Sequence, residues 1–527
     1  MINNDILNYK IMPLFDIKNA AKMLLMNKDY NKLNICNLDN IKEYKNDILN
    51  NKRYKNIEKL EYIYNNEKEF DWSIEFLKMI KLKNLKKLIC KKYNNLYTIP
   101  KKKGIKYLDC SNSPNLKRIP HIEGLEYLDC SNCPNLIELP NIDGLKYLNC
   151  SGCPKLSKLP EIYELKYLNY SNNPNITEIL EIDGLKELIC NNCPNLVRIE
   201  KIESLEYLNC SSCPGLKVIF KMKNLKELDC KNCINLKEIY LMRKLEKLDC
   251  SDCNKMMNLP EFKNLKKLIC ENNNQISTIT KLNNLIELKC SHCINLILIK
   301  LEKLEILICE NCPKLKKISE MAKLKKINSS YCETLEKIRN LENLKELKCN
   351  SCPKLKSLRT LKNVKKIECM NCIELKSIKG LKNLVELNCS WCKNIQSIKR
   401  LFKLEKLNCS YAEKIELITN LYNLKYLNCD NCPKLKTINK VEHLNILLCN
   451  YCDKLESILD LKNLKKLNCS YCSQITSIKN LDKLTELTCK CCDNLTNLIG
   501  IRKIKKITCV CCNKLLIPDN IKCEIIK

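Results

Sequence analysis

Glycine is scarce in this chain, with 8 residues among 527, and histidine is scarcer still, with 3. Neither a G-x-G-x-x-G motif nor a phosphate-binding loop occurs, so the common nucleotide-binding signatures are excluded. His121, His292 and His443 lie far apart, and none has an acidic residue and a nucleophile at a recurring spacing. We therefore expect no enzyme active site, and we expect His292 and His443 to be exposed.

The sequence also lacks a run of about 18 apolar residues, which a membrane-spanning helix requires. Its start, Met1-Ile2-Asn3-Asn4-Asp5, has no basic segment followed by an apolar core, as a secretory signal peptide has. We expect a monomeric, intracellular, cytoplasmic protein with no membrane contact. In such a reducing compartment its 41 cysteines would be free thiols.

Positive charge exceeds negative, with 92 Lys and Arg against 60 Asp and Glu, a formal net charge of +32. Such an excess favours acidic partners, nucleic acid among them. The lysines are spread along the chain, however, and Lys, Asn, Ile and Tyr are abundant together, as an A/T-rich genome would produce. A solvated basic surface and a polyanion-binding surface are both open interpretations.

One pattern organises most of the chain: L-x-x-L-x-C-x-x-C-x-x-L-x-x-I/L recurs every 20 residues from about Leu85 to Cys512, as in 145–165. Eleven copies begin at Leu85 to Leu285, one residue is missing after Ile299, and eleven more begin at Leu304 to Ile504. A fixed period of this size is the signature of a solenoid.

Within one copy, Leu148 and Cys150 alternate with polar Asn149 and Ser151, which predicts a strand with one buried face. The return segment contains Pro160, and 20 residues leave no room for a full α-helix there. We expect an extended or 3-10 return.

This pattern resembles the leucine-rich repeat family, L-x-x-L-x-L-x-x-N/C-x-L, with Cys150 in the third leucine slot and Cys153 in the asparagine/cysteine slot. The resemblance implies an α/β solenoid, a horseshoe of about 22 repeats over residues 82–515 with a parallel sheet on its concave face. The ending Leu139-Pro140-Asn141-Ile142 looks like the short bacterial type. The Cys-rich Lys/Asn/Ile style is similar to arrays in giant DNA viruses of amoebae, which would place the chain in a host cytoplasm.

The C-x-x-C spacing is also half of a zinc site. Other residues replace cysteine in both columns, though, which a metal ladder would not tolerate. Tyr170 and Ser329 do so in the first column, and Tyr93, Ser113, Asn173, Asn273 and Ala412 do so in the second. We predict buried thiol ladders without metal or cofactor; zinc, an iron–sulfur cluster and disulfides are the alternatives.

The ends of the chain lie outside the repeat. Apolar residues at helical spacing in residues 1–40, together with Asn27-Lys28-Asp29-Tyr30, resemble a degenerate F-box, a unit that docks on the adaptor of cullin-type ubiquitin ligases. The resemblance implies docking through Ile6, Leu7, Ile11, Leu14 and Leu25. A plain helical cap over the apolar solenoid end is the alternative. We predict a helical linker or cap at 41–81 and a half-repeat cap at 516–527.

Two sets of aromatic residues are candidates for partner binding, because tyrosine and tryptophan are common at interfaces. The first occupies the outward third position of the strands: Tyr107, Tyr127, Tyr147, Tyr167 and Tyr207. The second adjoins the second cysteine column: Tyr331, Trp391, Tyr411, Tyr451 and Tyr471. Aromatic residues also favour strands for their own sake.

The sequence thus predicts a non-enzymatic scaffold that binds a protein on its concave face. A substrate-recognition subunit of a ubiquitin ligase is the first alternative. A binder of nucleic acid or another polyanion is the second.

Overall fold

A computed structural model describes residues 59–61, 85–92, 94, 96–99, 101–358, 361–517 and 523–526, with the backbone alone at 59–61. These residues fall into two units, Met1–Cys253 (unit 1) and Asn254–Lys527 (unit 2). The F-box-like residues of 1–40, and the capping role proposed for them, lie outside the described residues.

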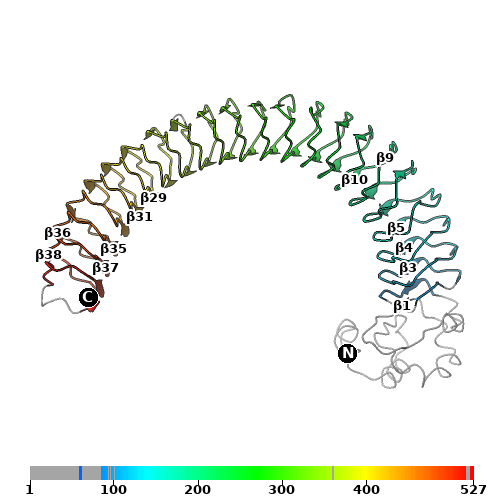
Figure 1. Ribbon diagram of the computed structural model, residues 1–527, viewed down its shortest axis with the longest axis horizontal. Coiled ribbons are helices and arrows are strands. Elements are labelled where there is room, and N and C mark those ends of the chain that lie inside the picture. Colours follow the sequence, from blue (N-terminus) through cyan, green and yellow to red (C-terminus); the bar gives the residue numbers. More distant parts are fainter. Residues whose placement is uncertain are drawn as a thin grey trace, which may run out of the picture. The chain divides into compact units, whose positions relative to one another are not determined.

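Each repeat contributes one three-residue strand to a parallel sheet on the inner side of its unit, and we call these the concave strands (Figure 1). In unit 1 they are β1 (Lys59–Glu61), β2 (Lys87–Ile89), β3 (Tyr107–Asp109), β4 (Tyr127–Asp129), β5 (Tyr147–Asn149), β6 (Tyr167–Asn169), β8 (Glu187–Ile189), β10 (Tyr207–Asn209), β12 (Glu227–Asp229) and β14 (Lys247–Asp249). In unit 2 they are β15 (Lys267–Ile269), β17 (Glu287–Lys289), β19 (Ile306–Ile308), β21 (Lys326–Asn328), β23 (Glu346–Lys348), β25 (Lys366–Glu368), β27 (Glu386–Asn388), β29 (Lys406–Asn408), β31 (Tyr426–Asn428), β33 (Ile446–Leu448), β35 (Lys466–Asn468), β37 (Glu486–Thr488), β39 (Lys506–Thr508) and β40 (Glu524–Ile526).

A second series of short parallel strands lies on the return side of the repeats (Figure 1). In unit 1 these are β7 (Glu178–Ile179), β9 (Arg198–Ile199), β11 (Val218–Ile219) and β13 (Glu238–Ile239). In unit 2 they are β16 (Thr278–Ile279), β18 (Leu298–Ile299), β20 (Lys317–Ser319), β22 (Lys337–Arg339), β24 (Ser357–Leu358), β26 (Ser377–Ile378), β28 (Ser397–Lys399), β30 (Leu417–Thr419), β32 (Thr437–Asn439), β34 (Ser457–Leu459), β36 (Ser477–Lys479) and β38 (Asn497–Ile499). The extended alternative for the return is confirmed, and no 3-10 helix occurs in the described residues.

Proline explains which returns form strands. Where Glu200 follows Ile199, its N–H donates to the Ile179 carbonyl at 2.8 Å and completes the ladder. Pro140 and Pro160 occupy the same position in their repeats and have no N–H to donate. The returns that end in these prolines therefore lack a named strand.

Equivalent residues of neighbouring repeats lie opposite each other, as Leu128 and Leu148 do in β4 and β5. The register moves by 20 residues per turn except between β17 and β19, where Glu287 faces Ile306. Because β18 ends at Ile299 as the period requires, the missing residue was lost from the turn that follows the return strand. Both the repeat and the place of the deletion are confirmed.

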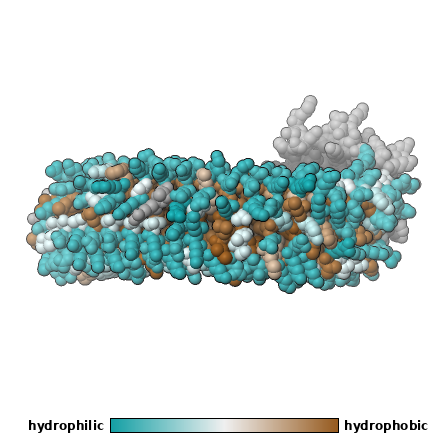
Figure 2. Space-filling model, turned by 90° about the horizontal axis from the view of Figure 1, so that it is seen from above, coloured by the Kyte–Doolittle hydropathy of each residue, from teal (hydrophilic) through white to brown (hydrophobic). Residues whose placement is uncertain are grey.

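The core consists of the apolar slots of the repeat. Leu145, Leu148, Cys150, Cys153 and Leu156 are all 0% exposed. On the face drawn in Figure 2, hydrophilic side chains dominate and hydrophobic ones gather in strips between them.

The helical prediction for 41–81 is wrong at Lys59–Glu61, which forms β1 and pairs in parallel with β2. Leu60 faces Leu88, so the backbone joins the sheet in the register of the repeats. The signal was present in Ile57-x-x-Leu60-x-Tyr62, which matches the first half of the repeat. No α-helix occurs among the described residues, so the predicted helical cap has no support there.

Candidate interaction surface

Four tyrosines stack on the concave strands of unit 1. Tyr107, Tyr127, Tyr147 and Tyr167 are the first residues of β3 to β6, and parallel pairing in register places them side by side. Successive ring centroids are 4.0, 4.1 and 4.3 Å apart, and the ring planes differ by 7° or less. We call these four residues the tyrosine column. Glu187 separates Tyr207 from it, so the structure brings together four of the five predicted tyrosines.

The phenol groups of the column are neutral and held in place. The Tyr127 hydroxyl is hydrogen-bonded to the hydroxyls of Tyr107 and Tyr147, and burial is the largest cause of its raised pKa. Burial likewise raises the pKa of Tyr167 to about 12. The Lys87 ammonium lies 3.8 Å from the centroid of the Tyr107 ring, a cation–π contact at the end of the stack. The column is thus a rigid amphipathic strip, half-buried against the sheet.

The turn after each concave strand is fixed by a side chain of that strand. Asn149 Oδ1 accepts hydrogen bonds from the backbone N–H and the hydroxyl of Ser151, at 3.3 and 2.9 Å. Asp129 does the same for Ser131. Such Asx turns order the backbone without regular secondary structure. They hold the strand ends, and the tyrosines on those strands, in one spacing.

Lysines on the concave strands are largely paired with glutamates. In unit 1, Glu126 bridges Lys106 at 2.6 Å and Lys146 at 2.9 Å, and hydrogen bonds from these two lysines lower the Glu126 pKa to about 2. In unit 2, Lys and Glu alternate at the position that tyrosine holds in unit 1. The pairs there are Lys267–Glu287 at 3.2 Å, Lys326–Glu346 at 3.1 Å, Lys366–Glu386 at 3.3 Å, Lys406–Glu386 at 3.0 Å, Lys466–Glu486 at 2.9 Å and Lys506–Glu524 at 3.1 Å. The positive charge of these lysines is therefore balanced on the face itself.

The cysteine columns are buried thiol ladders, as predicted. The Cys153 thiol donates to the Cys130 carbonyl of the preceding repeat at 3.2 Å. Where Asn173 replaces cysteine, its Nδ2 donates to the Cys150 carbonyl at 3.0 Å and its Oδ1 accepts from the Cys153 N–H at 2.7 Å. Burial raises the pKa of the Cys133 thiol to about 12. The described residues hold no group of three or more His, Cys, Asp or Glu arranged to bind a metal ion.

A further surface column was missed by sequence reasoning. The residue before the second cysteine of each repeat has a positive φ, and we call this position the left-handed column. In unit 1 it carries residues that tolerate this conformation, such as Asn112 at 57° and Asn132 at 55°. The recurring Asn before the second cysteine was the available signal.

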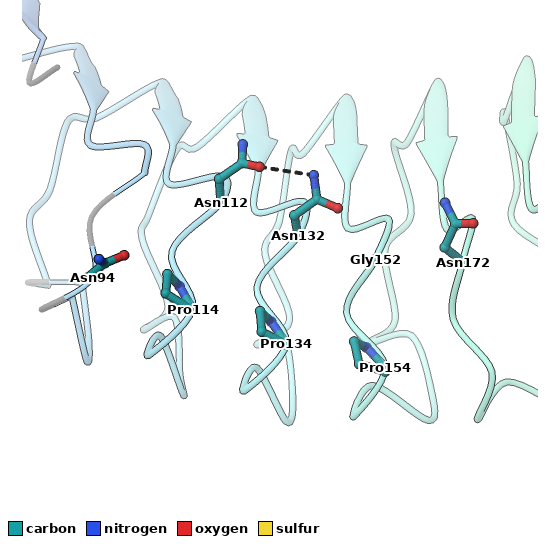
Figure 3. Close-up of a pocket in the computed structure, with 8 residues that line it drawn as sticks. All are labelled: Asn94, Asn112, Pro114, Asn132, Pro134, Gly152, Pro154 and Asn172. Atoms are coloured by element: carbon teal, nitrogen blue, oxygen red, sulfur yellow. Dashed lines mark hydrogen bonds between the residues drawn. The ribbon is translucent and has the colours of Figure 1, made fainter. Parts of the chain in front are cut away.

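In unit 1 the left-handed column borders a shallow groove of about 590 Å³, shown in Figure 3. The Asn132 amide donates to Asn112 Oδ1 at 3.2 Å along its upper edge. A Cβ at Gly152 would collide with the Asn132 side chain, so glycine interrupts the row there. The groove is lined by Asn94, Asn112, Pro114, Asn132, Pro134, Gly152, Pro154 and Asn172.

In unit 2 the same column carries the second predicted aromatic set. Tyr331, Trp391, Tyr411, Tyr451 and Tyr471 all have φ between 56° and 62° and are 37–57% exposed. Trp391 stacks on Tyr411 at 3.9 Å, and Tyr451 stacks on Tyr471 at 4.6 Å. Bulky residues rarely adopt this backbone conformation, and strain of this kind often marks a functional surface.

The histidines occupy the surface. His292 and His443 are exposed, as predicted, and His292 lies in the left-handed column, where its Nδ1 is 3.0 Å from Asn311 Nδ2. His121 is exposed as well, with Nδ1 2.7 Å from the Asn141 carbonyl. In the described ranges no helix is long and apolar enough to cross a membrane.

No protein-family model matches the sequence, and no curated protein matches it. Several solved structures are similar. YopM from Yersinia enterocolitica is 18% identical over 82% of this chain and 90% of that one, with a TM-score of 0.40. The functional domain of InlJ from Listeria monocytogenes, which includes a cysteine ladder, is 18% identical over 64% and 70%, with a TM-score of 0.27. A leucine-rich repeat protein from Bacteroides ovatus is 16% identical over 68% and 80%, with a TM-score of 0.28.

At these identities the likeness concerns the fold alone. The chain's own features define that fold: a 20-residue period, parallel strands in register and a recurring turn at the second cysteine. The described residues form a solenoid of the leucine-rich repeat type.

Proposed function

We propose that the chain is a non-enzymatic scaffold that binds a protein partner on its concave strands, with the tyrosine column of unit 1 as the principal contact. The stacked, half-exposed rings of Tyr107 to Tyr167 are the observation that carries the proposal. Rings already fixed by stacking and hydrogen bonding lose little conformational entropy on binding, so their contacts contribute to affinity more fully than those of mobile side chains.

The charge arrangement favours a protein over a polyanion at this face. Glu126 and Glu206 each bridge two lysines of unit 1, so the cations beside the tyrosines are already paired. A polyanion would have to displace these carboxylates, whereas a neutral or mixed protein surface would not. We also propose a reducing, intracellular location, supported by thiols that pack as hydrogen-bond donors to backbone carbonyls.

The test compares two sets of tyrosines in one unit. Partners captured by chemical cross-linking are identified, purified and titrated against wild type, Tyr127→Ala/Tyr147→Ala and Tyr163→Ala. Tyr163 is 69% exposed on the return side and is the matched control. We expect the double variant to weaken binding at least tenfold, or about 1.4 kcal/mol, as loss of a hot spot does, and Tyr163→Ala to leave it unchanged.

Tyr127→Phe sharpens the result, because it keeps the stacked ring and removes the hydroxyl. Equal binding by wild type and the double alanine variant would overturn the proposal. Binding whose logarithm falls steeply with that of salt concentration, unaffected by the tyrosines, would favour the polyanion alternative instead.

A further inference from the structure

Two consecutive repeats of unit 2 place cysteine in the left-handed column. Cys491 and Cys511 have φ of 49° and 56° and continue the line that Tyr451 and Tyr471 begin. Cys511 is exposed and Cys491 is partly exposed. Of the other cysteines in the described residues, only Cys512 and Cys523 are not buried. These two side chains therefore differ in environment from the ladder thiols.

Side chains at successive positions of this column are close and parallel. The Trp391 and Tyr411 rings are 3.9 Å apart, and the Tyr451 and Tyr471 rings are 4.6 Å apart. The Cys491 N–H donates to the Val510 carbonyl at 2.8 Å, which ties the two cysteine-bearing turns together. The Cys491 and Cys511 side chains are themselves in hydrogen-bond contact, and Tyr471 contacts Cys491 from the other side.

This arrangement satisfies the geometry of a disulfide. A disulfide joins residues whose Cα atoms are usually about 4.4–6.8 Å apart, and neighbouring parallel turns are about 4.8 Å apart. The ladder thiols have similar spacing but are shielded. Cys492, for example, is buried and its thiol donates to the Cys469 carbonyl at 3.0 Å. Spacing and access coincide at Cys491 and Cys511.

We propose that Cys491 and Cys511 form a reversible redox site, a surface dithiol that hydrogen peroxide converts to a disulfide linking two neighbouring repeats. In the first step a cysteine thiolate attacks one peroxide oxygen, the O–O bond breaks, and a sulfenic acid and hydroxide form. In the second step the other thiolate attacks the sulfenic sulfur, the S–S bond forms and the hydroxyl leaves. With the two thiol protons the products are one disulfide and two water molecules. Two electrons pass from the sulfurs to the peroxide.

The surroundings assign an order to the two cysteines. Cys511 is the more exposed, so it meets peroxide first. Desolvation and the neighbouring Cys511 sulfur raise the pKa of Cys491, which leaves less of it as thiolate for the first attack. Cys491 then acts as the resolving residue, because it touches the oxidised sulfur.

The experiment uses the full chain, reduced and then treated with one equivalent of hydrogen peroxide, followed by thiol blocking and peptide mapping without reductant. We expect a Cys491–Cys511 cross-link that dithiothreitol reverses. In Cys491→Ser, oxidation should stop at a sulfenic acid on Cys511 that dimedone traps. In Cys511→Ser, modification of Cys491 should fall at least several-fold. Cys492→Ser is the matched control, and it should retain the cross-link.

A stability readout accompanies the map. The cross-link closes a loop of about 20 residues and should raise the midpoint of thermal unfolding of the wild type, but not of either serine variant. A cross-link that persists in Cys491→Ser or Cys511→Ser would overturn the proposal. So would peroxide modification of both cysteines without a bond between them, or modification of neither.

Discussion

Units 1 and 2 use one core and carry their aromatic side chains in different columns. In unit 1 the rings stand on the concave strands, from Tyr107 to Tyr167, and the left-handed column is polar, with Asn112 and Asn132. In unit 2 the concave position alternates Lys and Glu, and the left-handed column carries Trp391 and other aromatic residues. The repeat therefore fixes the buried slots and leaves each surface column free to change.

The shared core predicts the largest effect. Leu148 of β5 and Leu407 of β29 are both 0% exposed in the same slot. Replacing either with alanine should cost about 3 kcal/mol, from lost burial and a residual cavity. Urea unfolding measures both. A loss in one unit alone would break the claim that the two cores are equivalent.

The concave columns should differ in their response to salt. Tyr147→Ala removes ring contacts on both sides and should cost about 1–2 kcal/mol at any ionic strength. Glu386→Gln breaks the pairs with Lys366 and Lys406 and should cost at most about 1 kcal/mol, because exposed ion pairs contribute little. Unfolding in low salt and in about 1 M salt separates them, since the Debye length falls to about 3 Å there. A salt-dependent tyrosine effect would contradict the assignment.

The left-handed column allows a reciprocal exchange. Tyr331→Asn should stabilise unit 2 by about 1 kcal/mol, because asparagine tolerates a φ of 61° better than tyrosine. Asn132→Tyr in unit 1 should destabilise by a similar amount, about 1 kcal/mol, for the same reason. Thermal unfolding of the two variants gives the signs. If Tyr331→Asn is destabilising, contacts of the tyrosine outweigh its backbone strain.

Each unit has one substitution in the first cysteine column, and the two should respond oppositely. Tyr170 is fully buried with no hydrogen-bond partner for its hydroxyl, so Tyr170→Phe should stabilise by about 1 kcal/mol. Ser329 donates to the Lys348 carbonyl at 3.5 Å, so Ser329→Ala should cost about 0.5 kcal/mol. Chemical denaturation checks both. A destabilising Tyr170→Phe would show that the hydroxyl has a partner in solution.

The smallest effect is a titration. The Glu126 pKa is lowered from 4.5 to about 2 by Lys106 and Lys146. Because the folded-state pKa is depressed, the carboxylate stabilises the fold above about pH 4.5, and this contribution is lost as pH falls toward 2. NMR titration of the Glu126 side chain measures the shift. In Lys106→Ala/Lys146→Ala the pKa should return toward 4.5, and an unchanged pKa would exclude the lysines as the cause.

Much of the fold was predictable because each buried slot recurs. Leu148, Cys150 and Leu156 repeat with their period, which located the strands, the thiol ladders and the tyrosine column before any coordinates. The left-handed column was harder, because φ is not read from hydrophobic periodicity and the tolerant residues of unit 1 give way to tyrosine in unit 2. The pairing of Glu386 with two lysines required the strand register as well as the alternation. β1 escaped because its half-repeat, Ile57 to Tyr62, stands 28 residues before the first regular copy instead of 20.

The central claim is that the aromatic column, and not the net positive charge, binds the partner. Its most direct test is the dissociation constant of the captured partner for wild type and for Tyr127→Ala/Tyr147→Ala, each measured at about 50 and 200 mM salt. The account predicts at least a tenfold loss in the double variant and a shallow salt dependence in both proteins. Equal affinities, with about a thousandfold loss between the two salt concentrations, would contradict it.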